Sequence, residues 1–437
     1  MIRLLQRVIE VEDDELGRVG WSCGYFFFIL AAYFIIRPLR EEMGVAGGVR
    51  NLPWLFTGTL VAMLLIHPPF GALVARLPRR RFVGVTYRFF TVNLLIFFAL
   101  RHALDPDHQV WLGRVFFVWT SVFNLFVVSV FWGFMADVFT TAQGKRLFGF
   151  IGVGGTLGGL LGSTLTAELA PQIGLSNLLL VSAGLLETGA FCSRRLSAAS
   201  ARAAQRGGPG HPAAGEEAVI GGSAIAGVAH VVRSPYLLGI CAYMLLFTIG
   251  STVLYFQQAE FASAITDSAE RTAFFARLEQ AVQVLTLLTQ AFLTGRILKW
   301  LGVVGTLTLL PALSVAGFLA LGTAHMLAVF VVFQVLRRAG EFAVAKPTRE
   351  VLYTVVSRED KYKAKNLIDT FVYRAGDQVG AWSYTLIASV GVGVAGIALL
   401  AAPIAGLWLA VAFWLGRRHE AIRARPDRHS GELPAAG

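Results

Sequence analysis

The chain is organised as long apolar stretches separated by short polar segments. Each stretch has about 17 to 25 mostly apolar residues, the length that a helix needs to cross roughly 30 Å of hydrocarbon. Twelve such stretches can be placed, so the pattern predicts an all-α polytopic membrane protein with twelve transmembrane helices. We place the spans at 19–42, 51–76, 82–101, 111–137, 147–169, 176–195, 234–259, 274–296, 302–321, 326–352, 365–388 and 392–416.

The composition excludes a soluble protein of this length. Hydrophobic residues make up 55% of the chain, charged residues 15%, and the mean hydropathy is +0.63. The first 20 residues hold five acidic side chains instead of a basic and then apolar run, so we expect the first span to be retained. The three cysteines lack the spacing of a disulfide framework or a metal site, and we expect neither a metal nor another cofactor.

The chain has a net charge of +11, and the distribution of its basic residues indicates the orientation of the protein in the membrane. With both termini in the cytoplasm, 25 Lys and Arg lie on the cytoplasmic side and about seven on the other, in agreement with the positive-inside rule. We therefore expect an integral protein of the bacterial inner (cytoplasmic) membrane with both termini inside. The same bias explains the positive charge without nucleic acid as a partner.

One segment has the composition of a linker and divides the chain into two halves. It is rich in Gly, Pro and Ala and lies between the sixth and seventh spans, where we expect a mobile cytoplasmic connection that ends in a short amphipathic helix at 224–233. The predicted domains are an N-terminal six-helix bundle at 1–195, a cytoplasmic linker at 196–233, a C-terminal six-helix bundle at 234–416 and a cytoplasmic tail at 417–437.

Glycine spacing suggests an internal repeat between the halves. In each half a lysine is followed 13 residues later by one glycine and four residues after that by another. A true repeat would pair the fifth span with the eleventh, whereas chance in a Gly-rich chain is the alternative. The fifth span also holds glycines four residues apart, which suit close helix packing better than a nucleotide-binding loop. The repeated residues are Lys145, Gly158 and Gly162, and Lys363, Gly376 and Gly380.

The loop between the second and third spans resembles a known motif. Residues 71–80 read GALVARLPRR and resemble the cytoplasmic loop motif of the major facilitator superfamily, G-x-L-x-D-R-x-G-R-R. Ala75 stands where that motif has Asp, and Pro78 where it has its second Gly. The resemblance implies a major-facilitator-like fold, while the missing carboxylate puts the motif's charge-relay role in doubt.

A possible enzymatic motif is weak. His102 and Asp107 have the H-x4-D spacing of membrane acyltransferases, in which a His-Asp pair can act as a base. They lie in a short loop predicted on the non-cytoplasmic side, without a second catalytic block, so a chance match is the simpler interpretation. We expect a protein that is not an enzyme.

The segment 337–377 is the most unusual part of the chain. It carries nine Lys or Arg and six Asp or Glu, although charges within a bilayer are costly unless paired or in a watery cavity, and normally mark a substrate or ion path. If the tenth span starts at the outer surface near 324–327, Arg337 and Arg338 lie roughly 15 to 20 Å deep. Glu341 follows four and three residues later and is expected to pair with them. A purely structural network of salt bridges is the alternative.

Further charges extend this pattern. Lys346 and Glu350 form another i,i+4 pair. In the eleventh span Asp369 lies one turn inside the cytoplasmic end, and Arg374 and Asp377 lie roughly 13 and 18 Å from it. These depths make Arg374 and Asp377 candidates for the lining of a cavity.

The first span also ends in charges. Its apolar run at 21–36 covers only about 24 Å, so the helix must include Arg37, Arg40 and Glu41 to cross. Arg37 and Glu41 share a helical face and can pair, although Pro38 can kink the helix here. The alternative is an interfacial cluster whose arginines reach the headgroups.

Two charged blocks resemble the ATP:ADP antiporter family, the nucleotide translocases of plastids and intracellular bacteria. Residues 357–369 read SREDKYKAKNLID and resemble that family's K-Y-K-x-K-x-x-I-D block. Residues 37–41 read RPLRE and are similar to its R-x-x-K-D block, with Arg40 at the Lys position and Glu41 at the Asp position. The resemblance implies exchange of nucleotides.

One position departs from the family. After the family's Arg-x-Gly, which is Arg374 to Gly376 here, a basic residue is common, whereas this chain has Asp377 and Gln378. The substitution changes the local charge by two units and argues against a simple transfer of ATP/ADP specificity. Another phosphorylated anion remains open.

We therefore expect an alternating-access membrane transporter that exchanges nucleotides or related phosphorylated anions and acts as a monomer in the bilayer. Guanidinium groups suit such a substrate because they offer bidentate donors to phosphate oxygens. The expected phosphate contacts are Arg37, Arg40, Arg337, Arg338, Lys346 and Arg374. The expected charge-pairing or proton-coupling carboxylates are Glu41, Glu341, Asp369 and Asp377.

Two alternatives stay open. One is a proton-coupled major-facilitator transporter of another solute, in which Glu341, Asp369 or Asp377 titrates. The other is a non-transporting membrane partner protein.

Overall fold

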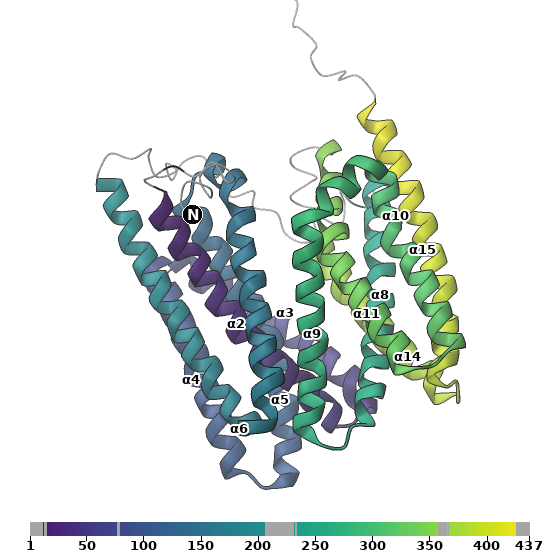
Figure 1. The fold of residues 1–437 in the computed structure, drawn as a ribbon, viewed down its shortest axis with the longest axis horizontal. Helices are drawn as coiled ribbons and strands as arrows, with labels where there is room; N and C mark the ends of the chain where they lie inside the picture. Colours follow the sequence, from purple (N-terminus) through teal and green to yellow (C-terminus); the bar gives the residue numbers. More distant parts are fainter. Residues whose placement is uncertain are drawn as a thin grey trace, which may run out of the picture. The chain divides into compact units, whose positions relative to one another are not determined.

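The computed structural model describes residues 12, 15–76, 79–205, 231, 234–356, 365 and 367–424, and over these ranges it holds helices and no strand (Figure 1). The chain forms two compact units. Unit 1 consists of Met1–Val219 and Tyr255–Leu287, and unit 2 of Ile220–Leu254 and Leu288–Gly437. The boundary between the units therefore lies within two helices, α8 (Pro235–Ser263) and α9 (Ser268–Phe292). The domain limits expected from the linker stay a prediction.

The other helices belong to one unit each. Unit 1 contains α2 (Leu16–Ala46), the 3-10 turn η1 (Val49–Asn51), α3 (Leu52–Arg76), α4 (Arg79–Ala103), α5 (Pro106–Val138) and α6 (Thr141–Gln205). Unit 2 contains α10 (Thr294–Thr323), α11 (Leu327–Gly340), the π-helix η2 (Glu341–Ala345), α12 (Lys346–Leu352), the 3-10 turn η3 (Tyr353–Val355), the π-helix η4 (Ile368–Val372), α14 (Tyr373–Ser389) and α15 (Val394–Arg423).

The apolar stretches of the sequence fold as membrane-length helices. In the described part of the chain, eight helices are long and apolar enough to cross a bilayer. The prediction of an all-helical polytopic membrane protein is therefore confirmed. The count of twelve remains a prediction.

The helix α6 is far too long to be a single straight span. Its 65 residues would extend about 98 Å, three times the hydrocarbon thickness. Gly174 breaks it with φ 77° and ψ 163°, a backbone conformation that glycine adopts without steric cost. The break lies between the two spans expected at 147–169 and 176–195.

Glycines bring α6 against α2 in unit 1. A Cβ atom on Gly154 would lie 2.8 Å from the carbonyl oxygen of Cys23, and one on Gly158 would lie 2.8 Å from the carbonyl carbon of Phe27. Gly162 meets the backbone of Ala31 in the same way. The backbones of the two helices therefore touch at these glycines; both helices are labelled in Figure 1. The prediction that these glycines serve helix packing is confirmed, since small residues allow such close approach.

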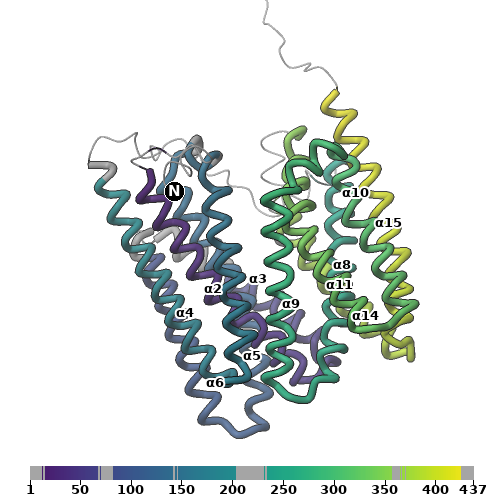
Figure 2. The backbone as a smooth tube through the Cα atoms, viewed as in Figure 1, coloured from purple at the N-terminus to yellow at the C-terminus, as the bar shows by residue number. Residues whose placement is uncertain are grey.

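Glycines also allow close helix packing in unit 2. Gly376 of α14 lies against Thr248 of α8, and Gly380 lies against Thr252 one turn further on. In each half, the glycine pair of the expected repeat thus packs on the first helix of that half. This common packing favours a true repeat over a chance match. Elsewhere in unit 2, α10 and α15 run side by side (Figure 2).

Several sequence predictions lie outside the described residues. They include the amphipathic helix at 224–233 except Val231, most of the linker and tail, and residues 357–364 of the K-Y-K block. The loop motif at 71–80 is described only in part, without its side chains.

Candidate functional site

The last turns of α2 hold a charged cluster within unit 1. The helix runs without interruption through Pro38 to Ala46, so Arg37 and Arg40 lie one turn apart on neighbouring parts of its surface. Glu41 and Glu42 are buried. The cluster therefore sits inside the unit rather than at its surface, which disfavours snorkelling arginines.

Arg37 pairs with a residue that sequence reasoning did not select. Its Nη1 lies 3.2 Å from Oε2 of Glu279 in α9, and the two side chains are 21% and 4% exposed. The expected partner was Glu41, which instead accepts a hydrogen bond of 2.9 Å from Nη1 of Arg40. The prediction failed because helical spacing identifies neighbours on one helix and says nothing of a facing helix.

Arg40 is held by three kinds of contact. Besides Glu41, its Nε donates to the carbonyl oxygen of Phe117 over 3.3 Å, and its guanidinium carbon lies 3.8 Å from the centre of the Phe117 ring. The hydroxyl of Tyr255 donates to the second carboxylate oxygen of Glu41. These contacts fix the orientation of the guanidinium group, as a preorganised anion site requires.

The charges in this cluster balance. Arg37 and Arg40 have Glu279 and Glu41 as partners, so the four groups carry no net charge. Two further polar contacts join α9 to its neighbours: Gln280 donates to Thr164 in α6 over 3.0 Å, and Ser268 donates to Glu42 in α2 over 2.6 Å. An entering anion must therefore compete with carboxylates for the two guanidinium groups.

In unit 2, Arg337 ties three helices together. It is 3% exposed, and its donors reach the Ser314 hydroxyl in α10 at 3.2 Å, and the Ser251 hydroxyl at 3.0 Å and the Phe247 carbonyl oxygen at 3.1 Å in α8. The ring of Trp408 in α15 lies 5.9 Å from its guanidinium carbon. The hydrogen-bond donors of Arg337 are thus bound by groups of the protein itself, and these bonds position α11 against α8 and α10.

Replacing Arg337 by Lys is expected to lower the thermal stability of the protein. A single ammonium group cannot reach the acceptors on α8 and α10 together, and each buried acceptor left without a donor costs about 1–3 kcal/mol. The measurement is Tm of the purified protein in detergent. Arg296→Lys is the control because Arg296 is exposed. An unchanged Tm for Arg337→Lys would contradict this role.

Glu341 pairs across a π-helix. The carboxylate accepts a hydrogen bond of 2.8 Å from Nη1 of Arg349, eight residues along the chain. The pair expected between Glu341 and Arg337 does not form, because the donors of Arg337 are bound by Ser314, Ser251 and Phe247. The wider turns of η2, which begins at Glu341, instead set the register that brings Arg349 to the carboxylate. Arg338 is half-buried.

Lys346 and its neighbours lie at a more open part of unit 2. Lys346 is exposed at the start of α12, and Glu350 pairs with Lys365 at 2.6 Å instead of with Lys346. Asp369 is exposed in the second π-helix, η4, within the electrostatic influence of Arg349 and Lys365. Two π-helices thus flank the charged residues, and such distortions often occur at functional sites.

Asp377 neutralises Arg374 inside unit 2. One carboxylate oxygen lies 3.2 Å from Nη1 of Arg374, and the other accepts from the Thr252 hydroxyl over 3.3 Å. Asp377 is buried. The residue at which this chain departs from the ATP:ADP antiporters therefore serves as the partner of the predicted phosphate ligand Arg374.

Glu279 and Arg349 are the functional candidates that sequence reasoning missed. Both are ionisable residues inside predicted spans, so the rule that selected the other charges applies equally to them. Tyr255 carried no such signal, because a tyrosine in an apolar helix is ordinary. Only the packing of α8 brings its hydroxyl to Glu41.

The possible acyltransferase pair does not form in the structure. His102 contacts the carbonyl oxygen of Phe98 at 2.9 Å, and the carboxylate that contacts an imidazole is Asp105, beside His108. In the described part of the chain, no group of three or more His, Cys, Asp or Glu is arranged to hold a metal ion.

Known proteins resemble this chain over nearly its whole length. ADP,ATP carrier protein 2 of Chlamydia pneumoniae is 21% identical, over 90% of this chain and 87% of the carrier. ADP,ATP carrier protein 1 of Chlamydia muridarum (strain MoPn / Nigg) is also 21% identical, over 98% of this chain and 93% of the carrier. No protein-family model matches the chain. The predicted resemblance to the ATP:ADP antiporters is confirmed.

A solved structure shares the fold. The nucleoside transporter NupG has a TM-score of 0.60 at 11% identity, over 95% of this chain and all of that one. A bacterial homologue of the human lysosomal transporter Spinster gives 0.59 over 95% of this chain and all of that one. Both solved proteins are named as transporters, and this chain shares their fold.

Proposed function

We propose that this protein is an antiporter that exchanges nucleotides, or closely related phosphorylated anions, by alternating access. One observation carries the proposal: two guanidinium groups lie inside an apolar unit and each forms an ion pair with one carboxylate, Arg37 with Glu279 and Arg40 with Glu41. The similarity to two ADP,ATP carriers supports a nucleotide as the anion. We place the protein in a bacterial inner membrane with both termini in the cytoplasm.

The paired charges favour exchange over uniport. When phosphate oxygens bind Arg37 and Arg40, they replace Glu279 and Glu41 as partners, and the carboxylates return when the anion leaves. A state with the arginines lacking either partner would hold buried unpaired charge, which costs several kcal/mol. An incoming anion that directly displaces the departing one avoids this unpaired step, so transport is fastest when each departing anion is replaced by another.

In unit 2 the proposed contacts are Arg338, Lys346, Arg374 and, in addition, Arg349. Arg349 and Arg374 each have one carboxylate partner, Glu341 and Asp377, which repeats the arrangement of unit 1. We assign Arg337 a positioning role because its donors are bound by the protein. Asp369 is the exposed carboxylate available to pair with Lys346 between transport steps.

Asp377 bears on the choice of substrate. It weakens the positive field around Arg374, whereas the related family commonly has a cation beside this arginine. We therefore propose that the transported anion carries fewer negative charges than ATP, as ADP or a nucleoside monophosphate does.

A thermal-shift series tests the substrate class. A ligand at roughly 100 times its Kd stabilises a protein by about 2.7 kcal/mol, so we expect ADP to raise Tm by several degrees and adenosine, which lacks phosphates, to leave it unchanged. Arg37→Gln should lose the shift, and the exposed Lys299→Gln should keep it. Equal shifts with ADP and adenosine, or none with any nucleotide or phosphorylated metabolite, would contradict the proposal.

A further inference from the structure

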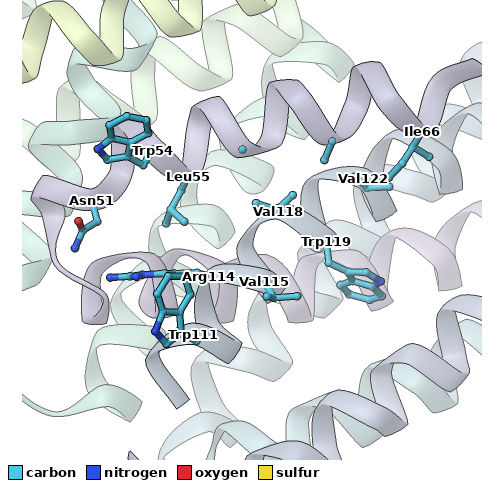
Figure 3. Close-up of a pocket in the computed structure, with 12 residues that line it drawn as sticks. Asn51, Trp54, Leu55, Ile66, Trp111, Arg114, Val115, Val118, Trp119 and Val122 are labelled. Carbon is cyan, nitrogen blue, oxygen red and sulfur yellow. The ribbon is translucent and has the colours of Figure 1, made fainter. Parts of the chain in front are cut away.

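A groove runs along the outside of unit 1 between α3 and α5 (Figure 3). Its volume of about 650 Å³ is in the range of small-molecule sites. The lining side chains recur every three or four residues, so each helix contributes one continuous face. They are Asn51, Trp54, Leu55, Gly58, Ala62 and Ile66 from η1 and α3, and Trp111, Arg114, Val115, Val118, Trp119 and Val122 from α5.

Most of the groove is apolar and accessible from outside the unit. Leu55, Gly58, Ala62 and Ile66 follow one another over about 16 Å of α3. Next to them Val61 and Leu65 are exposed large hydrophobic residues. An exposed apolar helix face in a membrane protein lies against lipid, so we expect an acyl chain rather than water in this part.

One end of the groove is polar and aromatic. Asn51 and Trp54 stand near the start of α3, and Trp111 and Arg114 near the start of α5 (Figure 3). The tryptophans are 65% and 63% exposed. Exposed tryptophans are typical of the level at which headgroups meet hydrocarbon.

The depth of Arg114 agrees with this level. The 33 residues of α5 extend about 50 Å, so about 10 Å projects beyond each side of a 30 Å hydrocarbon layer. Arg114 lies eight residues, or about 12 Å, from the first residue of α5. With α5 centred on this layer, we expect the guanidinium group close to the boundary between hydrocarbon and headgroups.

The guanidinium group of Arg114 has hydrogen-bond donors without a protein acceptor among the described residues. Its guanidinium carbon lies 4.4 Å from the centre of the Trp111 ring. Among the described residues it has no hydrogen-bond acceptor and no carboxylate partner, and its Nε is buried without a partner. A half-buried guanidinium at the end of an apolar groove attracts a phosphate that is attached to an acyl chain.

We propose that this groove binds an anionic phospholipid of the surrounding bilayer, with the phosphate on Arg114 and one acyl chain along Gly58 and Ala62. The site lies in unit 1, apart from Arg37 and Arg40, and does not depend on what the protein transports. The charge complementarity at one end and the apolar wall along the rest match the two parts of such a lipid.

Native mass spectrometry of the purified full-length protein tests this. The protein is titrated with dioleoyl phosphatidylglycerol and, separately, with dioleoyl phosphatidylcholine, which has the same chains but no net charge. We expect the wild type to prefer phosphatidylglycerol, and Arg114→Gln to bind it roughly 5-fold to 10-fold more weakly, because the variant loses charge-assisted hydrogen bonds that water replaces only in part. Arg114→Lys should keep part of the affinity.

Two sets of variants distinguish lipid binding in the groove from nonspecific electrostatic attraction between lipid and protein. Arg277→Gln removes the same charge from an exposed position nine residues into α9 and should leave the affinity unchanged. Gly58→Leu fills the apolar wall and should weaken both lipids; a Cβ at Gly58 meets only Val118 at 3.5 Å, so the helix has room for the backbone of the variant. If Gly58→Leu does not fold, Ala62→Leu serves as the second variant that fills the same apolar wall.

Three results would overturn the proposal. They are equal losses for Arg114→Gln and Arg277→Gln, equal binding of the two lipids by the wild type, and full affinity in both groove-filling variants. Transport does not enter these measurements, so their failure and a failure of the proposed antiport are distinguishable.

Discussion

Replacing Arg37 by Gln is expected to reduce nucleotide exchange roughly 10-fold to 100-fold, since a hydrogen bond to a charged group is worth about 1.5–3 kcal/mol and 1.4 kcal/mol is a factor of ten. It should also destabilise the protein, because Glu279 is 4% exposed and a buried carboxylate without its partner costs about 3–5 kcal/mol. The measurements are exchange of labelled ADP in proteoliposomes and Tm in detergent.

The double variant Arg37→Gln/Glu279→Gln separates the two effects. Both charges are then removed, so stability should return close to that of the wild type while exchange stays low. Lys299→Gln controls for loss of an exposed charge. Recovery of exchange together with stability in the double variant would show that the pair only holds α2 and α9 together.

Replacing Gly158 by Ala is expected to lower Tm by about 5 °C or more, because overpacking costs about 1–3 kcal/mol and this collision is with backbone atoms. The new Cβ would lie 2.8 Å from the carbonyl carbon and 2.9 Å from the Cα of Phe27 in α2. No rotamer change relieves such a contact, so α2 and α6 must move apart.

Gly152→Ala is the matched control for this prediction. Gly152 lies in the same helix, and a Cβ there would have no atom within 4 Å. Its substitution should leave Tm unchanged or raise it slightly, since Ala is the better helix former. Equal Tm values for the two variants would contradict the close contact between α2 and α6.

Much of the fold could be predicted because the bilayer imposes a simple rule on sequence. Apolar stretches of membrane length fold as helices. α2 and α5 contain the whole of their expected spans, and α8 and α15 begin one and two residues after the expected start of theirs. Helix-packing glycines were also predictable, since spacing alone identifies small faces.

The partners of the charged residues could not be predicted in the same way. Spacing on one helix suggested Arg37 with Glu41 and Arg337 with Glu341, whereas the structure pairs Arg37 with Glu279 and Glu341 with Arg349. The first pair joins two helices far apart in sequence, and the second depends on the register change at η2. Both effects arise from tertiary packing, which no local pattern contains.

Counterflow in proteoliposomes tests whether this protein exchanges phosphorylated nucleotides. Purified protein in liposomes loaded with unlabelled ADP should take up labelled ADP several-fold faster than in empty liposomes, without any pH gradient. Uptake that is unaffected by internal nucleotide, or that requires a proton gradient instead, would contradict the account.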